Sequence, residues 1–267
     1  MNHKRIITLV TDWNNKSYYI GAVKGELLKR CPESTIIDIT HYISPFNISQ
    51  AAYVIKNSYK SFPDNSIHFI GVCTEFTKET PYVLVNENEH WFIGADNGIF
   101  SLMFENLPEK IIKLNITENQ IFSSFPELEI FPGIISKLIY GQAHDILGEE
   151  VHELYSKFNL NPVYEGNTLN GNIIFIDSYN NIITNITNEL FNKLRNGRRF
   201  DIYVQNQNYR ISKISKRYNE VDKGELVAIF NSSGNLEIAM NYSSVAELLN
   251  LDNKSKIMIK FYDSQNS

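Results

Sequence analysis

The sequence contains few cysteines, little net charge and no long apolar run. Its two cysteines, Cys31 and Cys73, can form one disulfide at most and match no metal-binding spacing such as C-x-x-C, so we expect free thiols. The formal net charge of -5 excludes the broad positive field with which proteins attract nucleic acid or an anionic membrane. The longest early apolar run, Ile6–Val10, is too short for a signal-peptide core or a membrane span, which predicts a cytoplasmic protein.

The sequence also lacks the common catalytic and nucleotide-binding motifs. It has no Walker loop and no G-x-G-x-x-G, G-x-S-x-G or H-E-x-x-H pattern. What is present is an ordinary globular composition, with 43% hydrophobic, 21% charged and 12% aromatic residues, which excludes a disordered or collagen-like chain. The length of 267 residues allows one large domain or two ordinary ones.

The first 160 residues alternate between strand-like and helix-like patterns. Such alternation predicts an α/β domain in which helices cover a central sheet. The expected elements, in chain order, are a strand at Arg5–Val10, a helix at Gly21–Arg30, a strand at Thr35–Thr40, a helix at Ile48–Tyr59, a strand at Ser66–Val72, a hairpin of Tyr82–Val85 and Trp91–Ile93, and helices at Gly98–Phe104 and Ile130–Tyr140.

Near residue 165 the pattern changes to a polar, glycine-bearing stretch followed by short strands. We therefore predict two domains, an α/β domain over residues 1–164 and a smaller all-β, barrel-like domain over residues 165–267. The expected elements of the second domain are strands at Ile173–Ile176, Ile182–Asn185, Phe200–Val204, Tyr209–Ile214, Leu226–Asn231, Leu236–Asn241 and Lys256–Phe261, and one helix at Asn188–Arg195.

Polar residues at predicted strand ends are candidates for a ligand site. Asp12 follows the first strand directly, at the carboxyl edge where open α/β sheets bind ligands, although a turn or helix cap explains it equally well. His41 ends the second strand, where a lone histidine is more often a structural group than a general base. Asp96-Asn97-Gly98 predicts a turn with a helix cap, and Asp177 fits an Asx turn between two strands.

The order of several short motifs is more distinctive than any one of them. They are Thr11-Asp12-Trp13, Tyr19-Ile20-Gly21 with Lys24-Gly25, Ile37-Asp38-Ile39-Thr40-His41, Pro45, Ala51-Ala52, Asp96-Asn97-Gly98, Ile176-Asp177 with Asn181 and Thr184-Asn185, and Asn231-Ser232 with Gly234 and Leu236-Glu237-Ile238-Ala239. In this order they resemble the S-adenosylmethionine hydroxide adenosyltransferase family, which includes the related fluorinase and chlorinase. The resemblance covers nearly the whole chain.

The resemblance implies an architecture and a reaction. It implies an N-terminal α/β domain, a C-terminal β-barrel domain and a homotrimer whose site lies between one subunit's N-terminal domain and a neighbour's C-terminal domain. The implied reaction converts S-adenosylmethionine and water to adenosine and methionine. Since the sulfonium already activates the attacked carbon, we expect no metal and no cofactor, and the partner is a small adenosyl ligand rather than nucleic acid or a membrane.

The resemblance also assigns substrate-binding residues. Asp12 matches the aspartate that grips the ribose hydroxyls, a role that suits the two oxygens of a carboxylate. Phe46 falls where an aromatic ring lies against the ribose. Asp177 and Ser232 match positions that hold the methionine end, and Asn181 matches one beside the adenine.

Two segments depart from the family pattern. Residues 72–77 read Val-Cys-Thr-Glu-Phe-Thr where hydrolases of the family carry Val-Asp-Pro-Gly-Val-Gly followed by arginines. Residues 124–129 read Ser-Phe-Pro-Glu-Leu-Glu where they carry Thr-Phe-His-Gly-Arg-Asp. The aspartate, arginine and histidine that set up the hydrolytic water are therefore missing. Ser17 also replaces an aspartate that contacts the substrate amine.

Glutamates occupy the same two segments. Glu75, Glu127 and Glu129 place carboxylates where relatives line the site. Two interpretations are open. Either one of these glutamates acts as a replacement general base or attracts the sulfonium cation, or all three face solvent because the activity was lost. Cys73 has no neighbouring His or Lys that would lower its pKa, so we interpret it as a buried, inert thiol.

The sequence thus supports three hypotheses. The first is an S-adenosylmethionine hydrolase-like enzyme, slow or inactive, whose catalytic candidates are Asp12, Glu127 and Glu75. The second is a non-catalytic protein of the same fold that binds an adenosyl compound. The third is an enzyme that uses the glutamates on a different nucleoside. Halogenation is disfavoured, because Glu127 and its neighbours replace the halide-binding turn and a carboxylate repels a halide.

Overall fold

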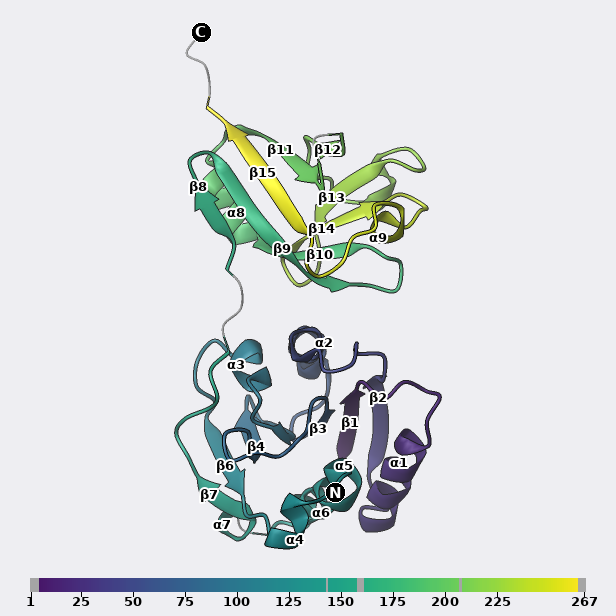
Figure 1. Ribbon diagram of the computed structural model, residues 1–267, viewed down its shortest axis with the longest axis vertical. Coiled ribbons are helices and arrows are strands. Elements are labelled where there is room, and N and C mark those ends of the chain that lie inside the picture. The colour runs from purple at the N-terminus through teal and green to yellow at the C-terminus, as the bar shows by residue number, and fades with distance from the viewer. Residues whose placement is uncertain (1–4, 143, 158–160, 207, 264–267) are drawn as a thin grey trace. The chain divides into compact units, whose positions relative to one another are not determined.

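A computed structural model gives the fold and describes residues 5–142, 144–157, 161–206 and 208–263 (Figure 1). The chain divides into two compact units, residues 1–158 and 159–267. The first unit is α/β and the second is small and barrel-like, as the sequence predicts. No helix in the described part of the chain has the length and apolarity to cross a bilayer.

A seven-stranded sheet forms the centre of the first unit. Its strands are β1 (Ile6–Thr11), β2 (Thr35–Thr40), β3 (Ile67–Gly71), β4 (Tyr82–Glu87), β5 (His90–Ala95), β6 (Lys110–Leu114) and β7 (Gly148–Glu150). They lie in the order β2-β1-β3-β5-β4-β6-β7. The first four in this order are mutually parallel, and each later pair is antiparallel. Four carboxyl ends therefore share one edge.

Helices cover both faces of this sheet. They are α1 (Tyr19–Arg30), α2 (Ile48–Ser58), η1 (Tyr59–Ser61), α3 (Ile99–Met103), α4 (Glu118–Ile121), α5 (Pro126–Glu129), α6 (Phe131–Ile139) and α7 (His144–Leu147). In β1, Ile7 and Leu9 pack into the core formed with α1 and α6, whereas Val10 packs into the core formed with α2 and α3. Burial on both faces explains why β1 is an uninterrupted run of apolar residues and threonine.

A second sheet curls into the barrel-like unit. Its strands are β8 (Val163–Glu165), β9 (Thr168–Ile176), β10 (Ile182–Thr187), β11 (Arg199–Val204), β12 (Arg210–Ile211), β13 (Leu226–Phe230), β14 (Asn235–Met240) and β15 (Lys256–Tyr262). The order is β12-β11-β15-β9-β10-β14-β13, with β8 beside β9. A bridge between Ile214 and Ala228 brings the chain after β12 to β13, so the sheet is nearly closed.

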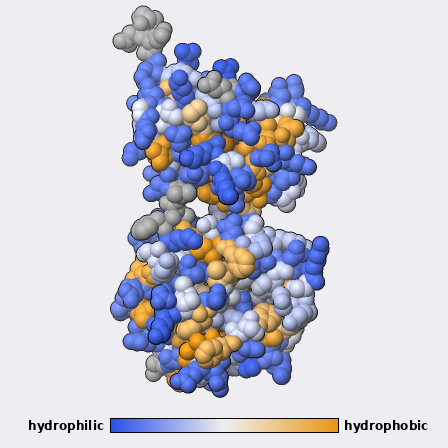
Figure 2. Space-filling model, viewed as in Figure 1, coloured by the Kyte–Doolittle hydropathy of each residue, from blue (hydrophilic) through white to orange (hydrophobic). Residues whose placement is uncertain are grey.

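Alternating side chains fill the interior of the second unit. On β15, Ile257, Ile259 and Phe261 are buried while their neighbours are more exposed. The unit also contains α8 (Asn188–Arg195), η2 (Tyr218–Glu220) and α9 (Val245–Leu248). Phe191 of α8 contacts the rings of Phe200 and Phe261, with centroids 5.0 and 5.9 Å apart. The visible surface of each unit is mostly hydrophilic (Figure 2).

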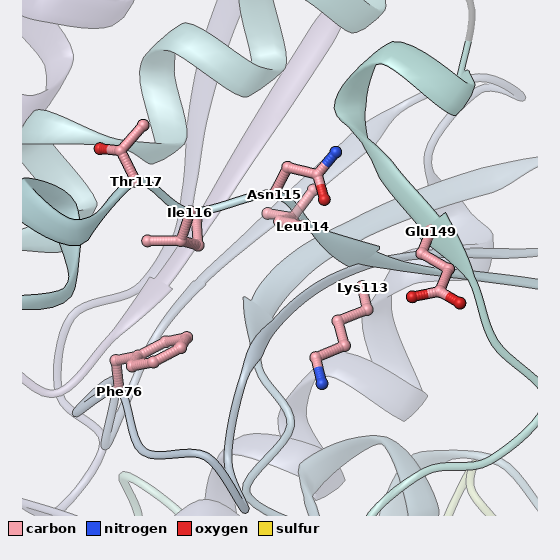
Figure 3. Close-up of a pocket in the computed structure, with 7 residues that line it drawn as sticks. All are labelled: Phe76, Lys113, Leu114, Asn115, Ile116, Thr117 and Glu149. Carbon is pink, nitrogen blue, oxygen red and sulfur yellow. The ribbon is translucent and has the colours of Figure 1, made fainter.

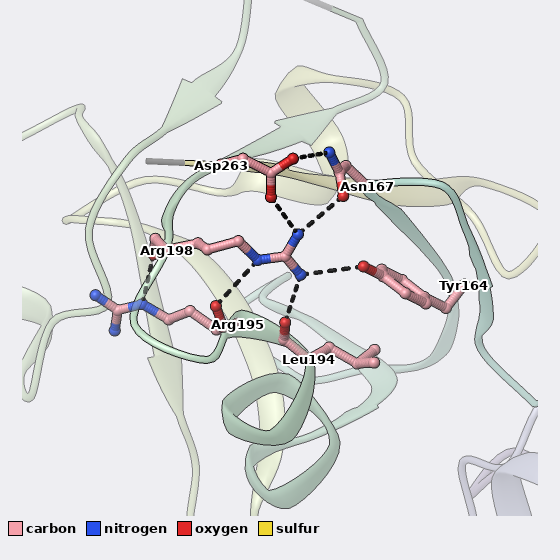
Figure 4. A network of polar contacts seen from close by, with 6 residues as sticks. All are labelled: Tyr164, Asn167, Leu194, Arg195, Arg198 and Asp263. Carbon is pink, nitrogen blue, oxygen red and sulfur yellow. Dashed lines mark hydrogen bonds and ion pairs between the residues drawn. The ribbon is translucent and has the colours of Figure 1, made fainter. Parts of the chain in front are cut away.

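Arg198 joins three segments of the second unit (Figure 4). Its Nη2 donates to the Tyr164 hydroxyl at 3.0 Å and to the Leu194 carbonyl at 2.6 Å. Its Nη1 donates to Asn167 Oδ1 at 2.8 Å and to Asp263 Oδ1 at 3.1 Å. Its Nε donates to the Arg195 carbonyl at 3.3 Å. The planar guanidinium can satisfy all five acceptors at once, which an ammonium group cannot do in the same geometry. The hairpin of β8 and β9 and the end of β15 are thereby tied to the end of α8.

Several elements differ from the prediction. The strand predicted over Tyr209–Ile214 is reduced to β12, and β9 begins at Thr168 rather than at Ile173. The polar stretch after residue 165 is part of a hairpin, because the polar residues of β9 alternate with buried Leu169 and with Gly171. The short strands β6, β7 and β8 were not predicted, since each has few residues to show a period of two.

Candidate active site

Polar residues follow all four parallel strands of the first unit at their shared edge. Asp12 follows β1, His41 follows β2, Cys73 lies two residues beyond β3, and Asp96 follows β5. Ligands of open α/β sheets bind at edges of this kind. Asp12 and His41 therefore lie at the carboxyl edge of the sheet, as the sequence predicts.

Asp12 is half-buried and held by the backbone of a neighbouring loop. The backbone N–H of Phe46 donates to Asp12 Oδ2 at 2.8 Å. Burial raises the pKa of the Asp12 carboxyl, and the Phe46 hydrogen bond opposes that shift. Phe46 has a left-handed backbone with φ of 63°, and its ring is 76% exposed. The loop thus fixes the carboxylate and leaves the aromatic ring free to contact another molecule.

His41 is buried, and both of its ring nitrogens have neighbours. Nδ1 lies 2.8 Å from Thr11 Oγ1, and Nε2 lies 3.2 Å from Asp38 Oδ1. Asp38 also pairs with Lys24 at 2.5 Å. Burial lowers the pKa of His41 despite the opposing effect of Asp38. These contacts favour the structural role over a general base.

Glu127 is the glutamate that the structure ties to the sheet edge where Asp12 lies, because its partner Thr74 belongs to the loop after β3, the strand next to β1. It lies on α5 and is 5% exposed, and Thr74 Oγ1 donates a hydrogen bond to its Oε1. Burial raises the pKa of Glu127, the Thr74 hydrogen bond opposes the shift, and the charge of Asp12 adds to it. The negative charge of Asp12 thus acts on Glu127 as a smaller effect than its burial, and we refer to these two residues as the carboxylate pair.

The other two glutamates are exposed. Glu75 lies in the loop after β3, where its charge helps to raise the pKa of Tyr82 after burial and Glu127. Glu129 accepts a hydrogen bond from Ser123 Oγ at 2.5 Å. Of the three, only Glu127 is buried and coupled to Asp12.

Cys73 differs from the prediction of a buried thiol. Both cysteines are free, but Cys31 is buried and Cys73 is exposed. The reason is its position in a loop, where φ of Cys73 is 52° and Asn97 Nδ2 donates to its carbonyl at 2.8 Å. Partial burial and the charge of Asp12 nevertheless raise the pKa of the thiol, so it is not an activated nucleophile.

Asp96 and Asn97 stabilise the turn that starts α3. Asn97 Oδ1 accepts from the backbone N–H of Ile99 at 3.2 Å, which closes the predicted turn, but the N-cap residue of α3 is Gly98 and no described side chain caps this helix. The N–H of Tyr155 donates to Asp96 Oδ2 at 2.9 Å, while Oδ1 of this buried side chain has no partner in the described residues. Burial raises the pKa of Asp96, and nearby Glu153 raises it further.

The second unit contains the remaining predicted residues. Asp177 Oδ1 accepts from the backbone N–H groups of Tyr179 and Asn181 at 2.8 and 2.9 Å, and Oδ2 accepts from Asn181 Nδ2 at 3.1 Å. This is the Asx turn that the sequence predicts. Asp177 and Asn181 are therefore adjacent, whereas Ser232 is exposed in the separate turn between β13 and β14.

Sequence reasoning missed a buried polar group in the same unit. Glu237 on β14 is 4% exposed; the Tyr218 hydroxyl donates to its Oε1 at 2.7 Å and Asn231 Nδ2 to its Oε2 at 3.3 Å. Burial, Glu237 and more weakly the charge of Asp177 raise the pKa of Tyr218. The available signal was a carboxylate inside an apolar strand.

A pocket of about 360 Å³ lies beside β6, β7 and the loop after β3 in the first unit (Figure 3). Its lining residues are Phe76, Lys113, Leu114, Asn115, Ile116, Thr117 and Glu149. The pocket lies against β6, which is separated in the sheet from β1 and Asp12 by β3, β5 and β4. None of the predicted site residues lines it. We therefore do not assign the candidate chemistry to it. Among the described residues, no cluster of His, Cys, Asp or Glu is arranged to hold a metal ion.

Comparisons with known proteins match the chain over both units. Residues 7–148 match the family model of the SAM hydroxide adenosyltransferase N-terminal domain, and residues 171–258 match that of the C-terminal domain. An (R)-S-adenosyl-L-methionine hydrolase of Methanocaldococcus jannaschii is 30% identical over 263 residues, which are 95% of each chain. A protein of the same name from Thermus thermophilus is 22% identical over 92% of this chain and 96% of its own.

Solved structures share the fold. A conserved protein from Thermotoga maritima, described as uncharacterized, superposes with a TM-score of 0.82 at 27% identity and covers 96% of this chain and 99% of its own. A conserved hypothetical protein from Thermus thermophilus gives a TM-score of 0.73 at 23% identity, over 97% and 100% of the two chains. The second likeness concerns the fold alone.

Proposed function

This chain belongs to the SAM hydroxide adenosyltransferase family, and on that premise we propose that it hydrolyses S-adenosylmethionine to adenosine and methionine. The observation that carries the proposal is the position of Asp12. It is a half-buried carboxylate at the carboxyl end of β1, and one of its oxygens is fixed by the Phe46 N–H. A carboxylate in that position suits the two hydroxyls of a ribose.

The reaction makes modest chemical demands on the protein. Water attacks the 5′ carbon of the adenosyl group, and the sulfonium leaves as a neutral thioether. Because the leaving group is already activated, the protein has to orient the adenosyl group and exclude bulk water rather than supply a metal or a cofactor. We therefore propose that the enzyme works without either.

Individual residues receive the roles that their family positions suggest. We propose that Asp12 binds the ribose hydroxyls and that the exposed Phe46 ring lies against the sugar. Asp177 and Ser232 would hold the methionine end of the substrate, and Asn181 would lie beside the adenine. In the Asp177 turn, the contacts to Tyr179 and Asn181 keep the carboxylate oriented before the substrate arrives.

We also propose a homotrimer in which the site combines the first unit of one protomer with the second unit of its neighbour. The division of predicted ligand residues between two compact units supports this arrangement. The free thiols of Cys31 and Cys73 fit a reducing compartment, and we propose that the protein is cytoplasmic.

Adenosine formation tests the proposal directly. Purified protein is incubated with S-adenosylmethionine, and adenosine is measured by chromatography against an Asp12→Ala variant. We expect adenosine from the wild-type protein, and a loss of roughly a hundredfold or more in the variant because substrate orientation is lost. Equal, background-level adenosine from both proteins would contradict the proposal.

A second candidate is a protein that binds an adenosyl compound without converting it. The observation that favours it is the sequence of residues 72–77 and 124–129, which contain no Asp, Arg or His. Calorimetry with S-adenosylmethionine separates the two candidates. Tight binding without adenosine release supports the second, and the absence of binding to any adenosyl ligand contradicts both.

A further inference from the structure

Glu127 has an unusual environment for a carboxylate. It is 5% exposed, and the side-chain hydrogen bond to its carboxylate in the described residues comes from Thr74. Glu129 on the same helix is exposed and bonded to Ser123 instead. Burying a carboxylate is costly unless a charge of opposite sign pairs with it. The partners of Glu127, the Thr74 hydroxyl and its own backbone N–H, are both neutral, so its burial calls for a physical reason.

The charge that acts on Glu127 does not neutralise it. Its coupling is to Asp12, which is also an acid, and no Lys, Arg or His in the described part of the chain forms an ion pair with either member of the carboxylate pair. Two coupled acids without a cation favour a positively charged ligand between or beside them. The sulfonium of S-adenosylmethionine carries such a charge.

The surroundings of Glu127 also suit proton transfer. Burial and the Asp12 charge raise its pKa, which brings a carboxyl group closer to neutral pH, where a general base is most effective. The charge of Glu127 also acts on Tyr82 of β4, whose raised pKa keeps the phenol protonated. The exposed Cys73 thiol, which the Asp12 charge also affects, stays protonated for the same reason.

We propose that Glu127 is the general base of the hydrolysis and that Thr74 positions its carboxylate. This assignment rests on the proposed function. As the water oxygen bonds to the 5′ carbon, the carbon–sulfur bond breaks and its electron pair goes to sulfur, which becomes the thioether of methionine. Glu127 takes the proton that the water loses and returns it to solvent, so the products are adenosine, methionine and one proton.

Single-turnover rates with enzyme in excess test the assignment. Glu127→Gln keeps the size of the side chain and removes its basicity, so we expect the rate to fall by about a hundredfold or more. We also expect the wild-type rate to rise with pH as Glu127 loses its proton, and we expect this rise to be absent in Glu127→Gln. Glu129→Gln is the matched control on the same helix, and its rate should stay within about twofold of wild type because that carboxylate faces solvent.

Thr74→Val provides a second, independent measurement if Glu127→Gln does not fold. Removing the hydroxyl removes a hydrogen bond that lowers the pKa of Glu127, so the pH midpoint of the rate should move upward. If Glu127→Gln keeps the wild-type rate and pH profile, or if folded Thr74→Val keeps the wild-type pH midpoint of the rate, the assignment of Glu127 as general base is wrong while the proposed function still stands. If wild-type protein forms no adenosine, the proposed function falls and this assignment falls with it.

Discussion

At the scale of single residues, His68 has an environment that opposes its charged form. It is buried in β3, with Nδ1 2.7 Å from Thr8 Oγ1 and Nε2 3.1 Å from His90 Nδ1. The ring of Phe92 stacks on it at a centroid distance of 4.8 Å. Burial, assisted by His90, lowers the pKa of His68 to about 3. The folded protein therefore holds this histidine neutral well below the pH at which an unfolded histidine is protonated.

Acid should destabilise the first unit through His68. The unfolded histidine binds a proton below its ordinary pKa of 6.5 and the folded one only near 3, so unfolding takes up a proton in this range. The stability that the folded protein gains by keeping His68 neutral is therefore complete above pH 6.5, and it is lost as the pH falls towards the folded pKa of about 3. From pH 7 to pH 5 we expect the free energy of unfolding to drop by about 2 kcal/mol from His68, measured by urea denaturation.

Two variants identify the source of that pH dependence. His68→Gln should unfold with a shallower pH slope, whatever its absolute stability, because it removes the titrating group. His152→Gln replaces an exposed histidine and should keep the wild-type slope. The same slope in wild type and His68→Gln would show that another group is responsible.

At the scale of elements, the turn before α3 is shaped by a close approach of the chain. Gly98 has φ of 96°, and a Cβ at this position would lie 2.6 Å from Lys157 Cβ and 3.4 Å from Tyr155 Cδ1. Ser101 Oγ lies between the two segments, accepting from the Lys157 N–H at 2.9 Å. Only glycine combines this backbone conformation with this contact.

Gly98→Ala should therefore destabilise the first unit by about 1–3 kcal/mol in denaturant unfolding, because it adds backbone strain and a clash. Gly141→Ala is the control. Gly141 has φ of 72°, but no described atom lies within 4 Å of the place that an alanine Cβ would take, so this variant carries the conformational cost alone. Equal losses in the two variants would argue that the contact with Lys157 contributes nothing.

Elements with strong local patterns were predictable from the sequence, and the site was predictable only in part. The apolar runs of β1 and β3 and the helical spacing in α2 and α8 indicate their structures directly. Asp12 could be placed because its position follows from the end of β1. The burial of Glu127 could not be predicted, because the carboxylate is hydrogen bonded to Thr74, a residue 53 positions away in the sequence. Likewise, Tyr218 and Glu237 meet only when the barrel folds.

At the scale of the whole molecule, the proposed shared site predicts complementation between two inactive variants. Asp12→Ala damages the first unit's part of the site. Asp177→Asn damages the second unit's part, while its amide oxygen preserves the acceptor of the turn. After the two proteins are dissociated, mixed equally and reassembled, about a quarter of the sites should hold both wild-type residues.

Recovered adenosine formation in the mixture, together with a trimeric mass by light scattering, is the expected result. An inactive mixture of properly reassembled trimers would place both residues of each site in one protomer. A monomeric mass for the active wild-type protein would contradict the shared site outright.

The contacts of residues 155–157 have a mechanical consequence. Tyr155 is hydrogen bonded to Asp96 and Lys157 to Ser101, so the chain is anchored at the edge where β1, β3 and β5 end. In the sheet, only β3 stands between the strand that precedes Asp96 and the strand that precedes Asp12. Tension applied at residue 157 is therefore borne first by Asp96 and by Ser101 of α3, so a pull on this segment would load the sheet edge that also carries Asp12 before it loaded the rest of the unit.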